Sequence, residues 1–208
     1  SVIKLEKPEL VALQEVDRNT NRAGENKKKK LAELLGMHYY FSKSISYNGG
    51  DYGVAILSKF PIVSSEQVML SNKVLGGEQR SLAIVTVELL DGQKLRFASA
   101  HLDLVFENRN AQMLELNAIS KKSAIPLLVA GDFNAVADSP EMTTLKQEFS
   151  LACASGCPLT FPSDKPNKAI DFIVANPQAS AKLTKRSYEA IGGQLASDHL
   201  PLLGVYSY

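Results

Sequence analysis

The chain has 208 residues, 45% of them hydrophobic and 22% charged, which is typical of a folded globular domain with a substantial core. Its net charge of +1, from 23 basic and 22 acidic side chains, neither favours nor excludes a polyanionic partner. No apolar run reaches the roughly 18 residues that a membrane span needs, and no secretory signal is visible. We therefore expect one domain over residues 1–208 without a membrane span, and the sequence predicts no particular compartment.

The first half of the chain combines short apolar runs with one helical segment. Residues 9–15 are typical of a buried strand that ends in a carboxylate. Residues 27–35 (KKKKLAELL) predict a helix, with Gly36 as its C-terminal cap. The four lysines are most simply a solvated helix face, and a nucleic-acid patch is the alternative. Further strand signals follow from Tyr39 onward, in residues 52–58, and from Pro61 toward Leu70.

The second half adds a hairpin, two helices and further strands. Asp91-Gly92, between the apolar runs 81–90 and 94–101, is a strong hairpin signal. Residues 107–121 carry a helical apolar stripe, and Ser139-Pro140 predicts the start of another helix. The remaining predicted strands are 126–131, 169–175 and 200–206. Many short strands with few helices and no internal repeat predict a single α/β sandwich domain.

The two cysteines, Cys153 and Cys157, lie four residues apart. Two thiols are not a disulfide framework, so they fit a helix-turn pair, a small-loop disulfide or two unrelated thiols. A functional role is not the favoured interpretation.

Polar residues that suit metal or phosphate chemistry stand at the ends of several apolar strands, where active sites collect on rigid scaffolds. Five segments share this feature: Leu13-Gln14-Glu15, Ser99-Ala100-His101-Leu102, Gly131-Asp132-Phe133-Asn134, Ile170-Asp171-Phe172 and Ser197-Asp198-His199. Glu15 offers a hard oxygen ligand of the kind that Mg²⁺ prefers, and a solvent-facing strand end is the alternative.

The Gly-Asp-Phe-Asn and Ser-Asp-His segments are the sharper signals. In an extended chain Asp132 and Asn134 would share one side, although the same residues also form Asx turns. Neighbouring residues of an extended segment point apart, so we expect Asp171 rather than Asp198 to orient His199. The chain has only three histidines, and two of them, His101 and His199, stand at such strand ends. Histidine is the side chain best suited to proton transfer near neutral pH.

Taken in order, these segments resemble the endonuclease/exonuclease/phosphatase superfamily of deoxyribonuclease I-like, metal-dependent phosphodiesterases. The resemblance extends from about Pro8 to Leu202 and rests on PELVALQEVD, YGVAILSKFPI, SAHLD, GDFNA, AIDFIVA and SDHLP. It implies a four-layer α/β/β/α sandwich of two mixed or antiparallel sheets, and a hydrolase of phosphate esters that uses Mg²⁺ or Mn²⁺.

The resemblance also implies a role for each matching residue. Glu15 and Asp198 correspond to the metal-binding carboxylates. Asp132 corresponds to the aspartate near the attacking water, and Asn134 to the asparagine on the phosphate. Asp171 corresponds to the partner of the final histidine, His199. His101 stands where deoxyribonuclease I and sphingomyelinases carry a histidine and abasic-site nucleases a tyrosine, which argues against abasic-site repair.

One feature departs from the family pattern. The family fold normally starts with a strand that carries a catalytic asparagine, ahead of the helix before the Leu-Gln-Glu strand. Here Ser1 to Leu5 already resembles the end of that helix. We therefore expect the first strand to be missing and the domain, residues 1–208, to be N-terminally incomplete.

The predicted substrate is a phosphodiester: a nucleic acid, a phospholipid or another small diester. The alternatives are a phosphomonoesterase of the inositol-phosphatase kind and a non-catalytic scaffold that binds a phosphorylated ligand. The expected partner is the phosphate-ester substrate, with nucleic acid as an open alternative, and the expected oligomeric state is a monomer. For Arg80 a surface ion pair is the favoured interpretation, and Tyr52, Lys59 and Arg109 are weaker site candidates.

Overall fold

The computed structural model describes residues 2–24, 26–153, 155–193 and 196–208, and its largest element is a six-stranded sheet. The strand order in that sheet is β4-β5-β6-β7-β9-β8. The bounds are β4 (Ile62–Met69), β5 (Ser81–Glu88), β6 (Lys94–His101), β7 (Leu127–Asp132), β8 (Ser150–Leu151) and β9 (Asp171–Ala175). All pairs are antiparallel except β6 and β7, which run parallel. Both faces of β5 are buried, as its nearly continuous apolar sequence predicts.

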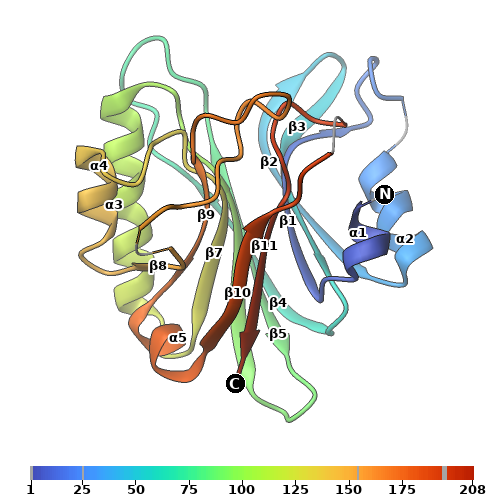
Figure 1. Ribbon diagram of the computed structural model, residues 1–208. Coiled ribbons are helices and arrows are strands. Elements are labelled where there is room, and N and C mark those ends of the chain that lie inside the picture. Colours follow the sequence, from blue (N-terminus) through green and yellow to red (C-terminus); the bar gives the residue numbers. More distant parts are fainter. Residues whose placement is uncertain (1, 25, 154, 194–195) are drawn as a thin grey trace.

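A second group of strands faces this sheet (Figure 1). It contains a three-stranded sheet of order β1-β3-β2 and a separate β10-β11 pair. The bounds are β1 (Leu10–Arg18), β2 (His38–Tyr47), β3 (Gly50–Ser58), β10 (Thr184–Ala190) and β11 (Leu202–Ser207).

Helices cover the two outer faces, which gives the predicted four layers (Figure 1). On one side α3 and α4 pack on the six-stranded sheet, and on the other α1 and α2 pack on β1, β2 and β3. A third apolar cluster fills the space between the two groups of strands. The helix bounds are α1 (Val2–Glu6), α2 (Lys27–Leu35), α3 (Phe106–Lys122), α4 (Pro140–Leu145) and α5 (Pro177–Lys182). None of the described helices has both the length and the apolar character needed to cross a bilayer.

Most predicted elements are present, and three described elements, β8, α5 and β10, were not predicted. The predicted helix over 27–35 matches α2, and Gly36 caps it in the left-handed conformation at φ 65°. The hairpin around Asp91-Gly92 and the Ser139 cap of α4 are also confirmed. The strand β8 has only two residues, and β10 is a mostly exposed strand of charged and polar residues without a clear apolar alternation.

The strand β1 has apolar contacts on both faces although it lies at the edge of its sheet. Leu10 and Ala12 pack toward the six-stranded sheet, while Val11 and Leu13 pack toward the helices. Within the described residues, one edge of β1 and one edge of β11 pair with no strand. The expected absence of a first strand stays a prediction.

Cys153 and Cys157 form a disulfide with an S–S distance of 2.09 Å. Of the three arrangements that the sequence left open, the small-loop disulfide is the one present. Its loop follows β8 and leads to Thr160.

Candidate active site

Sheet register brings three of the predicted site residues together. His101 ends β6 and Asp132 ends β7, and the two are direct partners in the parallel pair. Asp132 is in turn the partner of Asp171, which begins β9. The three side chains therefore stand on adjacent strands at one end of the six-stranded sheet. Figure 1 shows this end at the top.

The predicted pairing of His199 with Asp171 is present. Nδ1 of His199 lies 2.8 Å from Oδ2 of Asp171, and the same oxygen accepts a hydrogen bond from Oγ1 of Thr160 at 2.5 Å. Burial lowers the pKa of His199, but the hydrogen bond and charge of Asp171 outweigh it and raise the pKa to about 9. His199 is therefore a protonated imidazolium at neutral pH, with Nδ1–H held by Asp171.

His101 has the opposite electrostatic environment. It is buried, and Nη1 of Arg80 donates to its Nδ1 at 2.9 Å. Burial, the positive charge of Arg80 and that of His199 lower the pKa of His101 to about 3. The ring is therefore neutral, and because Nδ1 accepts from Arg80, its proton resides on Nε2.

Asp132 lies between the two histidines. Its Oδ2 is 3.6 Å from Nε2 of His101 and 3.9 Å from Nε2 of His199. Burial, followed by the nearby negative charge of Asp171, raises the pKa of Asp132 to about 7. A carboxyl group poised near neutral pH is suited to accept or give a proton.

In the Gly-Asp-Phe-Asn segment, Gly131 and Asp132 end β7 and a turn follows at once. Asn134 has a left-handed φ of 49°, and its backbone N–H donates to Oδ1 of Asp132 at 2.8 Å. The expectation that Asp132 and Asn134 share one side of an extended chain is therefore wrong, since the Asx turn holds them instead. The Asn134 amide also donates to the carbonyl of Leu102 at 2.9 Å, which ties the β7 turn to the residue after β6. At Gly131 a Cβ would stand 1.9 Å from the carbonyl oxygen of Ala100, so only glycine permits this approach of β7 to β6.

Glu15 occupies a β-bulge in β1. The register shifts between Leu13 and Val16, and Glu15 has a left-handed φ of 53°, which is uncommon for a residue with a side chain. The bulge is tied to β6, since Gln14 donates to Oγ of Ser99 and Ser99 donates to the carbonyl of Leu13, each at 3.1 Å. Strained bulges of this kind collect beside functional sites.

Tyr52 lies within electrostatic range of Glu15, of Glu78 and of Arg80. Burial and the negative charges of Glu15 and Glu78 raise the pKa of Tyr52 well above its usual range. Tyr52 therefore stays a neutral hydroxyl that can donate to the Glu15 carboxylate.

Among the described residues, one group of side chains lies close enough together to hold a cation. Asp132, Asp171 and His199 each offer an atom within 4.8 Å of the others. In that group His199 Nδ1 and Asp171 Oδ2 are already engaged with each other. The carboxylates that the sequence assigned to the metal, Glu15 and Asp198, are both exposed, and neither pairs with a cation among the described residues.

Arg80 is closer to the site than its sequence context predicted, and Thr160 was not predicted as a site residue. Arg80 does pair with Glu78 at 3.0 Å, but it is buried and contacts His101, so the favoured surface ion pair is wrong. Its Nε has no hydrogen-bond partner among the described residues. The signal available in the sequence was its place directly before a strand, at the same end of the sheet as His101. Lys59 donates to the carbonyl of Lys7, and Arg109 pairs with Glu141.

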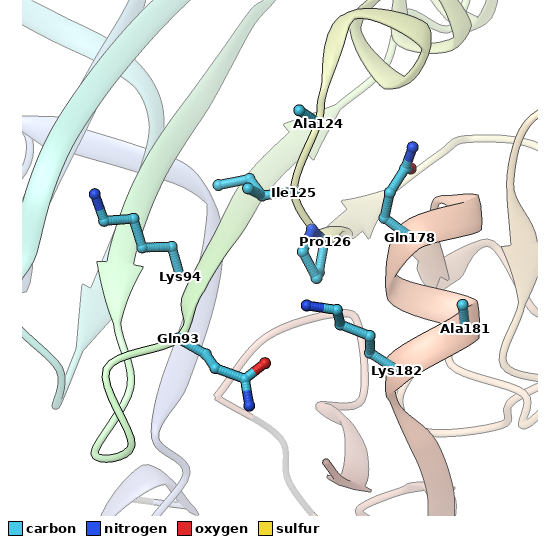
Figure 2. A pocket seen from close by; sticks show the side chains of 8 residues that line it. All are labelled: Gln93, Lys94, Ala124, Ile125, Pro126, Gln178, Ala181 and Lys182. Carbon is cyan, nitrogen blue, oxygen red and sulfur yellow. The ribbon is translucent and has the colours of Figure 1, made fainter.

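A separate pocket lies at the other end of the sheet (Figure 2). It contains none of the predicted site residues, because its walls come from the starts of β6 and β7 and from α5. Its lining consists of Gln93, Lys94, Ala124, Ile125, Pro126, Gln178, Ala181 and Lys182.

Comparison with known proteins identifies the family of the chain. The sequence model of the endonuclease/exonuclease/phosphatase family matches residues 1–199. The chain belongs to this family. Members of the endonuclease/exonuclease/phosphatase family are generally hydrolases that act on phosphate esters.

Individual relatives support the family and the fold. The uncharacterized protein YbhP of Escherichia coli K12 is 31% identical over 182 residues, which covers 83% of this chain and 69% of YbhP. The catalytic domain of human nocturnin, with a bound sulfate anion, is 25% identical at a TM-score of 0.75 and covers 99% of this chain and 83% of that one. A mannosyl-6-phosphatase of Bacteroides thetaiotaomicron is 16% identical, with a TM-score of 0.77 and coverage of 100% and 88%, which shows the shared fold.

Proposed function

We propose that this chain is a divalent-metal-dependent phosphodiesterase. One observation carries the proposal: the Nε2 atoms of two histidines converge on Oδ2 of Asp132, at 3.6 and 3.9 Å. Each histidine is held at its other nitrogen, His101 by Arg80 and His199 by Asp171. Two oriented N–H donors beside a carboxylate form a suitable cradle for the non-bridging oxygens of a phosphate.

In the proposed reaction a water oxygen bonds to phosphorus while one ester P–O bond breaks. Asp132 accepts a proton from the water, and the leaving oxygen takes a proton from solvent, which gives a monoester and an alcohol. His199 and His101 donate hydrogen bonds from Nε2 to the phosphate oxygens that gain charge. Fixed donors in a partly buried site stabilise that charge without reorganisation.

Glu15 and Asp198 are the proposed ligands of Mg²⁺ or Mn²⁺. They fit because both are exposed carboxylates that form no ion pair with another described residue, and hard divalent cations bind one or two carboxylates together with waters. When bound, such a cation neutralises charge on the phosphate oxygens. Glu15 is presented by the strained bulge in β1, and Asp198 is adjacent to His199.

The sulfate bound by the nocturnin domain supports an anion site in this fold, since sulfate and phosphate share a tetrahedral shape and oxygen charge. Asn134 is proposed to complete the cradle, because its amide keeps a second N–H donor beyond the hydrogen bond to Leu102. Because the structural relative from Bacteroides thetaiotaomicron is a mannosyl-6-phosphatase, monoester hydrolysis is the competing reaction to be tested.

The test uses bis(p-nitrophenyl) phosphate as the diester and p-nitrophenyl phosphate as the monoester, each with Mg²⁺ or Mn²⁺ and again with EDTA. His199→Ala should lower diester turnover by about 10²–10³-fold, as the loss of one preorganised donor typically does. His38→Ala is the matched control, since His38 is exposed at the start of β2. Faster monoester than diester turnover would contradict the phosphodiesterase assignment. The absence of metal-dependent turnover would favour the non-catalytic scaffold.

A further inference from the structure

The loops beside the proposed active site expose large apolar side chains. Leu75 is 100% exposed in the β4–β5 connection, where Val74 also faces solvent. Leu104 is 71% exposed and Phe106 45%, just after β6. We call Val74, Leu75, Leu104 and Phe106 the apolar rim. Exposed apolar clusters of this kind usually mark an interaction surface.

The apolar rim is held in place by the buried side chain of Asn108. Its Oδ1 accepts from the backbone N–H groups of Lys73 and Val74, at 3.0 and 3.1 Å. Its Nδ2 donates to Oδ2 of Asp103 at 2.9 Å. Since Asn108 fastens both loops, the rim is a built part of the fold.

Both rim segments connect directly to catalytic positions. The segment with Leu104 begins beside Leu102, whose N–H donates to the carbonyl of Asp132 at 2.9 Å. The β4–β5 connection ends at Arg80, which contacts His101. In Figure 1 this connection forms the arch above the first turn of α3, at the same end as the site.

The opposite end of the sheet gives an internal comparison. There Leu90, in the β5–β6 turn, is 99% exposed. A singly exposed leucine is ordinary for a folded protein. Leu75 and Leu90 are thus two leucines of equal exposure, one beside the site and one remote from it.

We propose that the apolar rim inserts into the surface of a phospholipid layer and presents headgroup phosphodiesters to the site. The inference rests on the phosphodiesterase function proposed above. Protruding apolar tips suit a fluid apolar layer, and the headgroup places a phosphodiester directly above that layer. Charges near the rim are mixed, with Lys73 against Glu78 and Glu107, so no surplus of cations marks a nucleic-acid surface.

Cosedimentation with phospholipid vesicles tests the surface without requiring turnover. One set contains phosphatidylcholine alone, and the other adds phosphatidylglycerol. Leu75→Asp should lower the partition coefficient at least about tenfold, because a leucine that inserts into the lipid layer is replaced by a charge, while Leu90→Asp should leave it unchanged. Equal behaviour of the two variants, or no binding by the original chain, would overturn the proposal. Binding that appears only with phosphatidylglycerol and survives Leu75→Asp would overturn it too.

A second arm separates this inference from the proposed function. Turnover of soluble bis(p-nitrophenyl) phosphate should be equal in the original chain, Leu75→Asp and Leu90→Asp, and only Leu75→Asp should lose hydrolysis of vesicle phosphatidylcholine. Turnover of the soluble diester without cleavage of phospholipid would reject the lipid substrate but support the proposed phosphodiesterase function. Vesicle binding without metal-dependent turnover of any diester would instead reject the phosphodiesterase and keep the lipid-binding surface.

Discussion

The proposed site has two halves that differ in how the fold holds them. His101, Asp132 and Asp171 are register partners on adjacent strands, so their relative positions are fixed by the backbone ladder of the six-stranded sheet. Glu15 and Asp198 are exposed and come from a bulge in β1 and from the segment before β11. The half built on the ladder is suited to fixed hydrogen-bond geometry, and the exposed half is suited to a ligand that arrives from solvent.

The largest effect should come from the histidine partner in the ladder half. Asp171→Asn should lower diester turnover by about 10²–10⁴-fold, the usual contribution of a correctly protonated and oriented catalytic group. The amide cannot hold His199 as an imidazolium, so the His199 pKa should fall below about 9, measurable by NMR titration of the ring. The control is Asp164→Asn, since Asp164 is exposed. A change at Asn176 would be a poor control, because Asn176 is buried. An unchanged His199 titration would show that Asp171 does not control this histidine.

A smaller effect is expected in the exposed half. Glu15→Gln should weaken Mn²⁺ binding by about 10–100-fold, because the amide removes one charged oxygen ligand. Turnover of Glu15→Gln should recover as the Mn²⁺ concentration rises. A substitution among the register partners His101, Asp132 and Asp171 should not be rescued in this way. Glu9→Gln, an exposed carboxylate just before β1, is the control. Calorimetric titration checks this, and equal Mn²⁺ affinity in both variants would remove Glu15 from the metal site.

The smallest effect, at most about tenfold in the unfolding equilibrium per pH unit, concerns the pH dependence of stability. The folded pKa of His101 is about 3, below its ordinary value of 6.5, so between these pH values the unfolded chain binds a proton that the native chain does not. The free energy of unfolding should therefore fall as the pH falls through this range, by at most about 1.4 kcal/mol per pH unit from this group. Urea unfolding in EDTA of the original chain and of His101→Gln measures the difference. Parallel pH profiles for the two proteins would contradict a neutral, buried His101.

Local signals in the sequence predicted much of the fold. The helix over 27–35 and the Asp91-Gly92 hairpin have strong short-range signals, and both are present. In β10 the polar sequence TKRSYEA gives little periodicity, so only pairing with β11 defines that strand. The disulfide between Cys153 and Cys157 was left open because spacing alone does not fix the geometry of a disulfide.

The same division applies to the site. The strand-end polar residues and the Asp171–His199 pair were predicted from neighbouring apolar runs and from the opposite orientation of adjacent side chains. Arg80 was misjudged because nothing local distinguishes a buried arginine from a surface one. Thr160 was missed because its hydroxyl reaches Asp171 only through the folded path of residues 160–171.

By itself, the sequence determined which residues can do chemistry and at which strand ends they stand, because apolar periodicity and turn residues act over short distances. Only the tertiary structure decided that Asp132 lies between two histidines, that burial and Arg80 keep one of them neutral and that Asp171 keeps the other charged. Burial and charge act through space between residues far apart in the chain. The protonation of each histidine is therefore a property of the folded site.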